Sequence, residues 1–318
     1  MIMPAIAIDT ASVASWARRL SLRSNSRLAS WLLNACLAGL SRLSPAGRAR
    51  AEKLLGFCYH RLAKRSRRVT QTNLCACFPA ASSEEIAERV RRSMYSAAAM
   101  IPEVACCWKG PTDAWREMID TVVGAEAVAA ELSAGRGVLA LGPHLGNWEV
   151  LNMYMGAEFG MAVLYDPPKI PGLDALVRQA RERTHSRLLP IGGAGLRGLL
   201  RHLRGGGLSG LLPDQVPHPD AGCYADFFGR PALTMTFAAR IIAAEQPKVF
   251  TATALRNDRG GFEIAFEDVT KQLQGLEQQP CCEAMNGLIE QLVRRAPEQY
   301  QWSYKRFKRP PAGTQRLY

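Results

Sequence analysis

The stretch Val138-Leu139-Ala140-Leu141-Gly142-Pro143-His144-Leu145-Gly146-Asn147-Trp148-Glu149-Val150 decides how the rest of the chain is interpreted. Its first four residues form an apolar run typical of a short buried strand, and Gly142-Pro143 ends that strand. Apolar residues resume at Trp148 and predict a helix over 148–156. His144 therefore lies in a strand-to-helix turn, ahead of the helix.

His144 and Glu149 are the first candidate catalytic residues. Five positions separate them, and on one regular helix that spacing would put the two side chains about 140° apart. With His144 in the turn, the carboxylate can reach the imidazole, accept the proton on one ring nitrogen and leave the other free to take a proton from a substrate hydroxyl. We predict that His144 is a general base oriented by Glu149. The alternative is an ordinary structural pair.

The segments around this stretch predict an α/β fold. Short apolar runs predict strands at 138–141, 161–165, 187–191, 208–212, 249–255 and 262–267. Helical patterns lie between them at 148–156, 173–184, 196–204 and 235–244. This alternation predicts a largely parallel or mixed central sheet of about six strands, covered by helices. Ligands bind beyond the carboxyl ends of such strands, where His144, Asp166 and Asp214 are expected to lie.

The first third of the chain has a different character. Residues 1–27 show no clear periodicity, and from Leu28 to about Trp108 the patterns are helical only. Ser82 and Glu85 form a capping box that predicts a helix running through Met94. We expect two regions: an N-terminal helical, basic, membrane-facing region at 1–110 and an α/β domain at 111–318.

Charge points to an anionic partner surface. The net charge is +12, with 13 Lys or Arg against two acids in residues 1–70. The sequence has no zinc-finger spacing, no RNA-recognition signature and no basic region flanked by heptads. We therefore predict that the partner is an anionic membrane surface and not nucleic acid. Leu28 to Ser41 is uncharged but would extend only about 21 Å as a helix, against roughly 30 Å of hydrocarbon core. We expect an interfacial or shallow anchor.

Metal and cofactor signals are weak. The nine cysteines give no paired C-x-x-C spacing, and no metal-binding His-Glu-x-x-His is present, so we predict no metal, no cofactor and a reducing cytoplasmic setting. One alternative is left open. Gly193, Gly195 and Gly198 match the dinucleotide fingerprint and follow a predicted strand.

Several blocks, taken together, carry a specific resemblance. His-x-x-x-x-Glu stands inside Pro143-His144-Leu145-Gly146-Asn147-Trp148-Glu149, and further blocks follow in order at 73–79, 165–169, 212–215, 227–232 and 296–308. In these residues the chain resembles the late lauroyl and myristoyl transferases of lipid A biosynthesis in Gram-negative bacteria, within the lysophospholipid-acyltransferase-like superfamily.

The resemblance implies acyl transfer from an acyl carrier protein thioester, or an acyl-coenzyme A, to a hydroxyl of a lipid A precursor or related anionic glycolipid. It places the reaction at the cytoplasmic face of the bacterial inner membrane. His144 and Glu149 would be catalytic, and substrate contacts would come from Asn147, Tyr165, Arg181 and Asp214. Asp166 stands where members commonly have Arg, so the acceptor can differ from the standard precursor. A non-catalytic lipid-binding protein on the same scaffold is the alternative.

Overall fold

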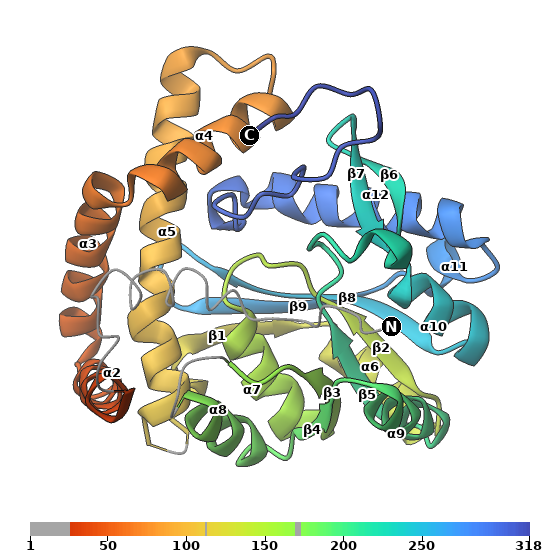
Figure 1. Cartoon of the computed structure of the whole chain (residues 1–318). Helices are drawn as coiled ribbons and strands as arrows, with labels where there is room; N and C mark the ends of the chain where they lie inside the picture. Colours follow the sequence, from red (N-terminus) through yellow and green to blue (C-terminus); the bar gives the residue numbers. More distant parts are fainter. Residues whose placement is uncertain (1–25, 112, 169–172) are drawn as a thin grey trace.

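A computed structural model of the chain describes residues 26–111, 113–168 and 173–318 (Figure 1). Of the segment 1–27, in which the sequence shows no clear periodicity, residues 1–25 lie outside the described residues, and Ser26 and Arg27 begin a helix.

A seven-stranded sheet forms the centre of the fold, in the order β1-β9-β8-β2-β5-β3-β4. The strands are β1 (Ile119–Val123), β2 (Val138–Leu141), β3 (Met161–Tyr165), β4 (Arg187–Pro190), β5 (Leu208–Leu211), β8 (Lys248–Arg256) and β9 (Phe262–Asp268). All neighbours pair in parallel except β8 and β9, which are antiparallel. The predicted mixed sheet is confirmed, and the six predicted strands have ends within one residue of those observed. β1 was not predicted.

Helices cover both faces of this sheet. They are α6 (Ala125–Ser133), α7 (Trp148–Phe159), α8 (Leu173–Glu182), α9 (Gly193–Arg204), α10 (Phe237–Glu245), α11 (Thr270–Leu273) and α12 (Gln278–Arg295). In β2, Val138 and Ala140 belong to one buried apolar cluster, whereas Leu139 and Leu141 belong to another. Since successive strand residues point to opposite faces, the sheet separates two cores, one against α7 and α8 and the other against α9, α10 and α12.

The N-terminal helices pack against the sheet domain. They are α2 (Ser26–Leu40), α3 (Pro45–Leu62), α4 (Lys64–Cys77) and α5 (Ser83–Lys109), which Figure 1 shows in red to yellow-orange beside the sheet. The predicted capping box at Ser82 and Glu85 opens α5. Leu74 on α4 and Met94 on α5 share a core with strand residues. None of the helices seen in the described part of the chain combines the length and apolar character needed to cross a bilayer.

A small hairpin and three short turns complete the structure. β6 (Gly222–Phe227) and β7 (Arg230–Met235) pair antiparallel, separately from the main sheet. The 3₁₀ turns are η1 (Arg116–Met118), η2 (Pro219–Ala221) and η3 (Pro297–Gln299). The hairpin packs on α12, and η3 packs on α5, so the C-terminal segment is drawn back toward the end of β2.

Candidate active site

The loop that follows β2 is held on two sides. Gly146 has φ of +63° and approaches the Ala254 carbonyl of β8 so closely that an added Cβ would lie 2.0 Å from that oxygen. Only glycine fits such a position. Leu145 forms a bridge with Tyr300, and the Gly146 amide donates to the carbonyl of Gln299 at 3.1 Å. The loop carrying His144 is therefore fixed by β8 and by the C-terminal segment.

The carboxylate that contacts His144 is Asp214, which follows β5. The His144 backbone N–H donates to Asp214 Oδ2 at 2.9 Å, and ring Nδ1 lies 2.7 Å from Oδ1. Since a carboxylate only accepts, Nδ1 carries the proton and Nε2 of the neutral ring is the acceptor. Each residue is 2% exposed. The prediction that Glu149 orients His144 is therefore wrong in its partner, because β5 lies next to β2 and brings Asp214 to the ring.

Asp214 is held in its charged form by its surroundings. Burial by itself raises the pKa of this carboxyl, but the charge of His144, the two hydrogen bonds from His144 and the charge of Arg306 together lower the pKa below its usual value. The carboxylate is therefore ionised at neutral pH. In that state it can stabilise a protonated imidazole.

The Glu149 side chain forms its hydrogen bonds with Trp108 and Arg181. Its carboxylate accepts from Trp108 Nε1 at 3.0 Å and from the Arg181 guanidinium, with Arg181 Nε at 3.3 Å and Nη2 on the other oxygen. Glu149 is 1% exposed. The buried ion pair joins α7 to α8, and the Trp108 hydrogen bond joins α7 to α5. Arg181 nevertheless lines the same pocket as His144, and its predicted substrate contact stays a prediction.

Both polar atoms of the Asn147 side chain form hydrogen bonds within the protein. Its Oδ1 accepts from the backbone amides of Glu149 and Val150 at 3.0 and 3.2 Å, which makes it the N-cap of α7. Its Nδ2 donates to Glu103 at 2.8 Å, and Arg256 of β8 pairs with the same carboxylate at 2.6 Å. With none of its surface exposed, Asn147 positions the loop. The predicted substrate contact is corrected to a structural role.

Glu52 of α3 lies near this Glu103 and Arg256 pair and is the site of our first prediction. Burial and then Glu103 raise its pKa from 4.5 to about 7, although Arg256 and Arg48 act to lower it. The folded chain thus holds the proton more tightly than the unfolded chain, so the free energy of unfolding falls as pH rises from 4.5 to about 7. Glu52→Gln should raise the Tm clearly at pH 8 and less at pH 5, measured by thermal denaturation. The exposed Glu263→Gln is the control, and equal shifts at both pH values would contradict this account.

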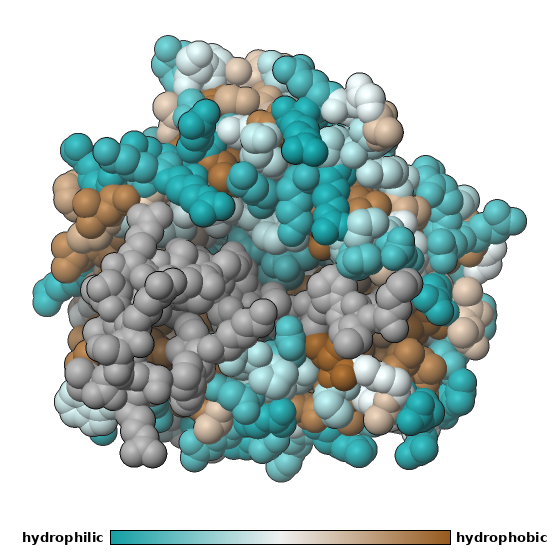
Figure 2. Space-filling model, viewed as in Figure 1, coloured by the Kyte–Doolittle hydropathy of each residue, from teal (hydrophilic) through white to brown (hydrophobic). Residues whose placement is uncertain are grey.

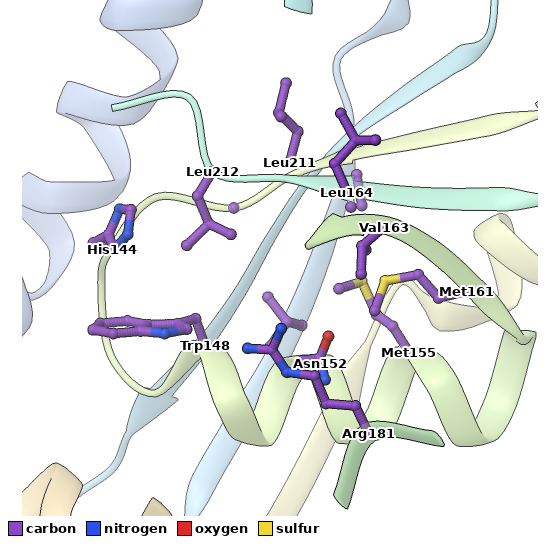
Figure 3. Close-up of a pocket in the computed structure, with 14 residues that line it drawn as sticks. His144, Trp148, Asn152, Met155, Met161, Val163, Leu164, Arg181, Leu211 and Leu212 are labelled. Atoms are coloured by element: carbon purple, nitrogen blue, oxygen red, sulfur yellow. The ribbon is translucent and has the colours of Figure 1, made fainter. Parts of the chain in front are cut away.

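An apolar pocket opens at His144. His144 and Trp148 lie at one end and Met155 and Met161 at the other, as Figure 3 shows. The remaining lining residues are Ala140, Gly142, Leu151, Asn152, Val163, Leu164, Arg181, Gly210, Leu211 and Leu212. Within the described residues, neither Trp148 Nε1 nor Asn152 Nδ2 has a hydrogen-bond partner, although both atoms are buried. Such donors need an acceptor, which a ligand can supply.

Tyr165 lies behind this pocket. It ends β3, is 2% exposed, and has the guanidinium carbons of Arg178 and Arg181 at 4.9 and 5.8 Å from its ring centre. Burial, with Asp174 beside it, raises its pKa, so the phenol stays neutral. Because Tyr165 packs against Arg181 and is not part of the lining, its predicted substrate contact stays a prediction.

The glycines of the dinucleotide-like motif have a packing explanation. Gly195 on α9 lies so close to β4 that an added Cβ would be 1.8 Å from the carbonyl oxygen of Pro190. Gly195 thus lets α9 pack closely against β4, the edge strand of the sheet. Among the described residues no group of three or more His, Cys, Asp or Glu is placed to hold a metal ion.

The chain is similar to known proteins over most of its length. The sequence model of the family described as bacterial lipid A biosynthesis acyltransferase matches residues 17–309. A lipid A biosynthesis palmitoleoyltransferase of Escherichia coli (strain K12) is 28% identical over 259 residues, covering 80% of this chain and 83% of that protein. A lauroyltransferase and a myristoyltransferase of lipid A biosynthesis from the same organism are each 26% identical, over 83% and 89% of this chain and 86% and 88% of their own lengths.

Proposed function

The chain belongs to the family of bacterial lipid A biosynthesis acyltransferases and is an O-acyltransferase, and on that premise we propose its reaction. It moves a fatty acyl chain from an acyl carrier protein thioester to a hydroxyl of a lipid A precursor or a related anionic glycolipid. The observation that carries the proposal is the buried His144 and Asp214 pair at the mouth of an apolar pocket. A base thus lies beside an apolar lining.

His144 Nε2 takes the proton of the acceptor hydroxyl, and the hydroxyl oxygen attacks the thioester carbonyl carbon. Asp214 holds the proton on Nδ1 and stabilises the imidazolium that forms. As the tetrahedral intermediate collapses, the carbon–sulfur bond breaks, the thiol leaves with the proton, and the ester remains on the acceptor. The thioester already has a good leaving group, so no residue of the chain needs to become acylated.

The negative oxygen of that intermediate needs hydrogen-bond donors. Trp148 Nε1 and Asn152 Nδ2 are buried, line the pocket and are unpartnered among the described residues. The Trp148 ring centre is 5.0 Å from that of His144, so the indole lies beside the proposed base. We assign the oxyanion to these two side chains rather than to Asn147, whose Nδ2 already donates to Glu103.

The acyl chain occupies the apolar end of the pocket in this proposal, which leads to a second prediction. A Cβ added at Gly210 would lie 3.1 Å from Met161 Sδ and 3.5 Å from Met155 Cε. Gly210→Ala therefore takes the space of about one methylene, whose burial is worth about 0.8 kcal/mol or roughly fourfold. The variant should shift donor preference toward shorter chains, measured as kcat/KM over a series of thioesters.

Gly287→Ala is the matched control for this prediction, because the added methyl group would lie in open space on α12. It should leave the chain-length profile unchanged. An unaltered profile in Gly210→Ala would show that the acyl chain binds elsewhere.

We also propose that the N-terminal helices α2, α3 and α4 dock on a membrane. Trp31, Leu32, Leu54, Phe57 and Leu62 of α2 and α3 are exposed apolar residues. Figure 2 shows brown side chains gathered over α3 beside hydrophilic ones. Exposed basic residues share these helices and α4, at Arg50, Lys53, Arg61, Lys64, Arg65 and Arg68. Apolar side chains among cations suit the interface of an anionic bilayer, and we place this face at the cytoplasmic side of the inner membrane.

The direct test mixes purified protein with acyl carrier protein thioester and a lipid A precursor. Mass spectrometry should find the precursor heavier by one acyl chain. A parallel reaction with the acyl-coenzyme A of the same chain distinguishes the two donors. Binding of the lipid without any mass gain from either donor would instead support the non-catalytic lipid-binding alternative.

A further inference from the structure

Gln215 is hydrogen-bonded to His144 Nε2, the nitrogen that accepts the proton of the acceptor hydroxyl in the proposed mechanism. Its side-chain Nε2 lies 3.1 Å from His144 Nε2, while the preceding residue, Asp214, holds Nδ1 of the same ring. Two consecutive residues thus bond to the two nitrogens of one imidazole. Gln215 is half-buried, whereas His144 is buried beneath it.

The orientation of the Gln215 amide follows from a second contact. The same Nε2 donates to Gln301 Oε1 at 3.3 Å. An amide nitrogen carries two hydrogens, so one can point to Gln301 and the other to the lone pair on His144 Nε2. Gln301 is itself fixed, because its backbone N–H donates to the His144 carbonyl at 3.0 Å.

The backbone around Gln215 is fixed, whereas its side chain is only half-buried. Asp214 is held by two bonds to His144, and the Val216 amide donates to Tyr304 Oη at 2.9 Å. Rotation of the Gln215 side chain is therefore enough to uncover the basic nitrogen, without movement of the neighbouring chain.

We propose that Gln215 is a positioning residue that keeps water away from His144 until the acceptor hydroxyl replaces it. The inference rests on the proposed function, since it concerns the same base. The amide nitrogen stands where the acceptor oxygen must lie, and both groups donate a hydrogen bond to Nε2. The exchange therefore replaces one hydrogen bond with another of similar strength.

The reaction that Gln215 suppresses is hydrolysis of the bound donor. A water at Nε2 would give its proton to His144, and its oxygen would attack the thioester carbonyl carbon. The carbon–sulfur bond would break, releasing a free fatty acid and a thiol. Water is small and abundant, whereas the glycolipid hydroxyl arrives with a large bound acceptor that can supply the contacts needed to displace the amide.

The test compares hydrolysis with transfer in Gln215→Ala and Gln215→Leu. Without acceptor, both variants should hydrolyse the acyl thioester roughly two- to tenfold faster than the unchanged chain, the ordinary value of one hydrogen bond. With saturating acceptor, transfer should change less than hydrolysis, so the ratio of free fatty acid to ester rises. Exposed Gln272→Ala on α11 is the control and should leave that ratio unchanged.

Gln215→Glu should have the opposite effect. A carboxylate against Nε2 favours the protonated imidazole, which cannot act as a base, so hydrolysis and transfer should both fall at least tenfold at neutral pH. A roughly hundredfold loss of both reactions in Gln215→Ala and Gln215→Leu, with the fold retained by circular dichroism, would overturn the proposal. It would make Gln215 a direct participant in the chemistry.

A second measurement does not depend on acyl transfer. Diethyl pyrocarbonate modifies the unprotonated nitrogen of histidine, and peptide mapping reports His144 alone. Modification of His144 should be faster in Gln215→Ala than in the unchanged chain or in Gln272→Ala. Equal rates would show that Gln215 does not cover the nitrogen. Failure of the unchanged chain to acylate any lipid, with faster modification in the variant, would reject the proposed function alone.

Discussion

Replacing His144 with alanine should lower the rate of acyl transfer by roughly 10²- to 10⁴-fold, the usual contribution of a general base. The imidazole carries Nε2, the nitrogen assigned to the acceptor hydroxyl, whereas Asp214 contacts the opposite ring nitrogen, Nδ1. Without the ring, no base is left beside the acceptor. The measurement is the single-turnover rate of ester formation at saturating donor, followed by mass spectrometry.

His144→Asn is the companion variant, because an asparagine keeps a polar side chain in the buried position beside Asp214. Both variants should bind the acyl donor nearly as well as the unchanged chain, since the apolar lining is untouched. If a folded His144→Ala protein turned over within a fewfold of the unchanged chain, His144 would not be the base.

Asp214→Asn should lower the rate of acyl transfer by roughly 10³- to 10⁴-fold, although the side chain keeps almost the same shape. An amide N–H directed at Nδ1 favours the tautomer with the proton on Nε2, the nitrogen that must accept it. Because the pKa of Asp214 is lowered below its usual value, the carboxylate is charged across neutral pH. The ratio of variant to unchanged rates is therefore to be measured at neutral pH, where Asp214 is ionised.

Glu149→Gln is the variant that distinguishes the role of Glu149 from that of Asp214. Glu149 pairs with buried Arg181, and breaking a buried pair typically costs about 3–5 kcal/mol of stability. This variant should lose far more Tm than Asp214→Asn and far less activity per folded molecule at low temperature. The reverse order would restore Glu149 as the residue that orients His144.

Much of the sheet could be predicted because its central strands are continuous apolar runs between glycines and helical segments. β2 and β3 were predicted with the observed bounds. β1 was missed because it is an edge strand in which four of five residues are exposed, so it lacks an apolar run. The hairpin β6 and β7 was missed because it lies outside the main sheet and turns at Phe228 and Gly229, both with positive φ.

The location of the site could be predicted from the sequence, but the carboxylate that contacts His144 could not. The sequence puts His144, Asp166 and Asp214 at one edge of the sheet, since each follows a strand. Strand order decides which carboxylate reaches the ring: β5 neighbours β2, whereas β3 lies one strand further away. Asp214 is therefore at the imidazole. A helix spacing cannot reveal a contact between residues 70 positions apart.

Gln215 was overlooked as a functional residue for the same reason. Its position directly after Asp214 was visible in the sequence, but its contact with His144 depends on how the loops after β2 and β5 face each other. The division into an N-terminal region at 1–110 and an α/β domain at 111–318 stays a prediction.

The most direct test of the account is a crystal structure of the chain with an S-alkyl pantetheine thioether, the part shared by both classes of acyl donor. We predict that the alkyl chain lies along Met155 and Met161, and that the carbon next to sulfur lies beside His144 Nε2, with Asp214 still bonded to Nδ1. An alkyl chain bound away from this pocket, or a His144 ring turned to Glu149, would contradict the proposed site.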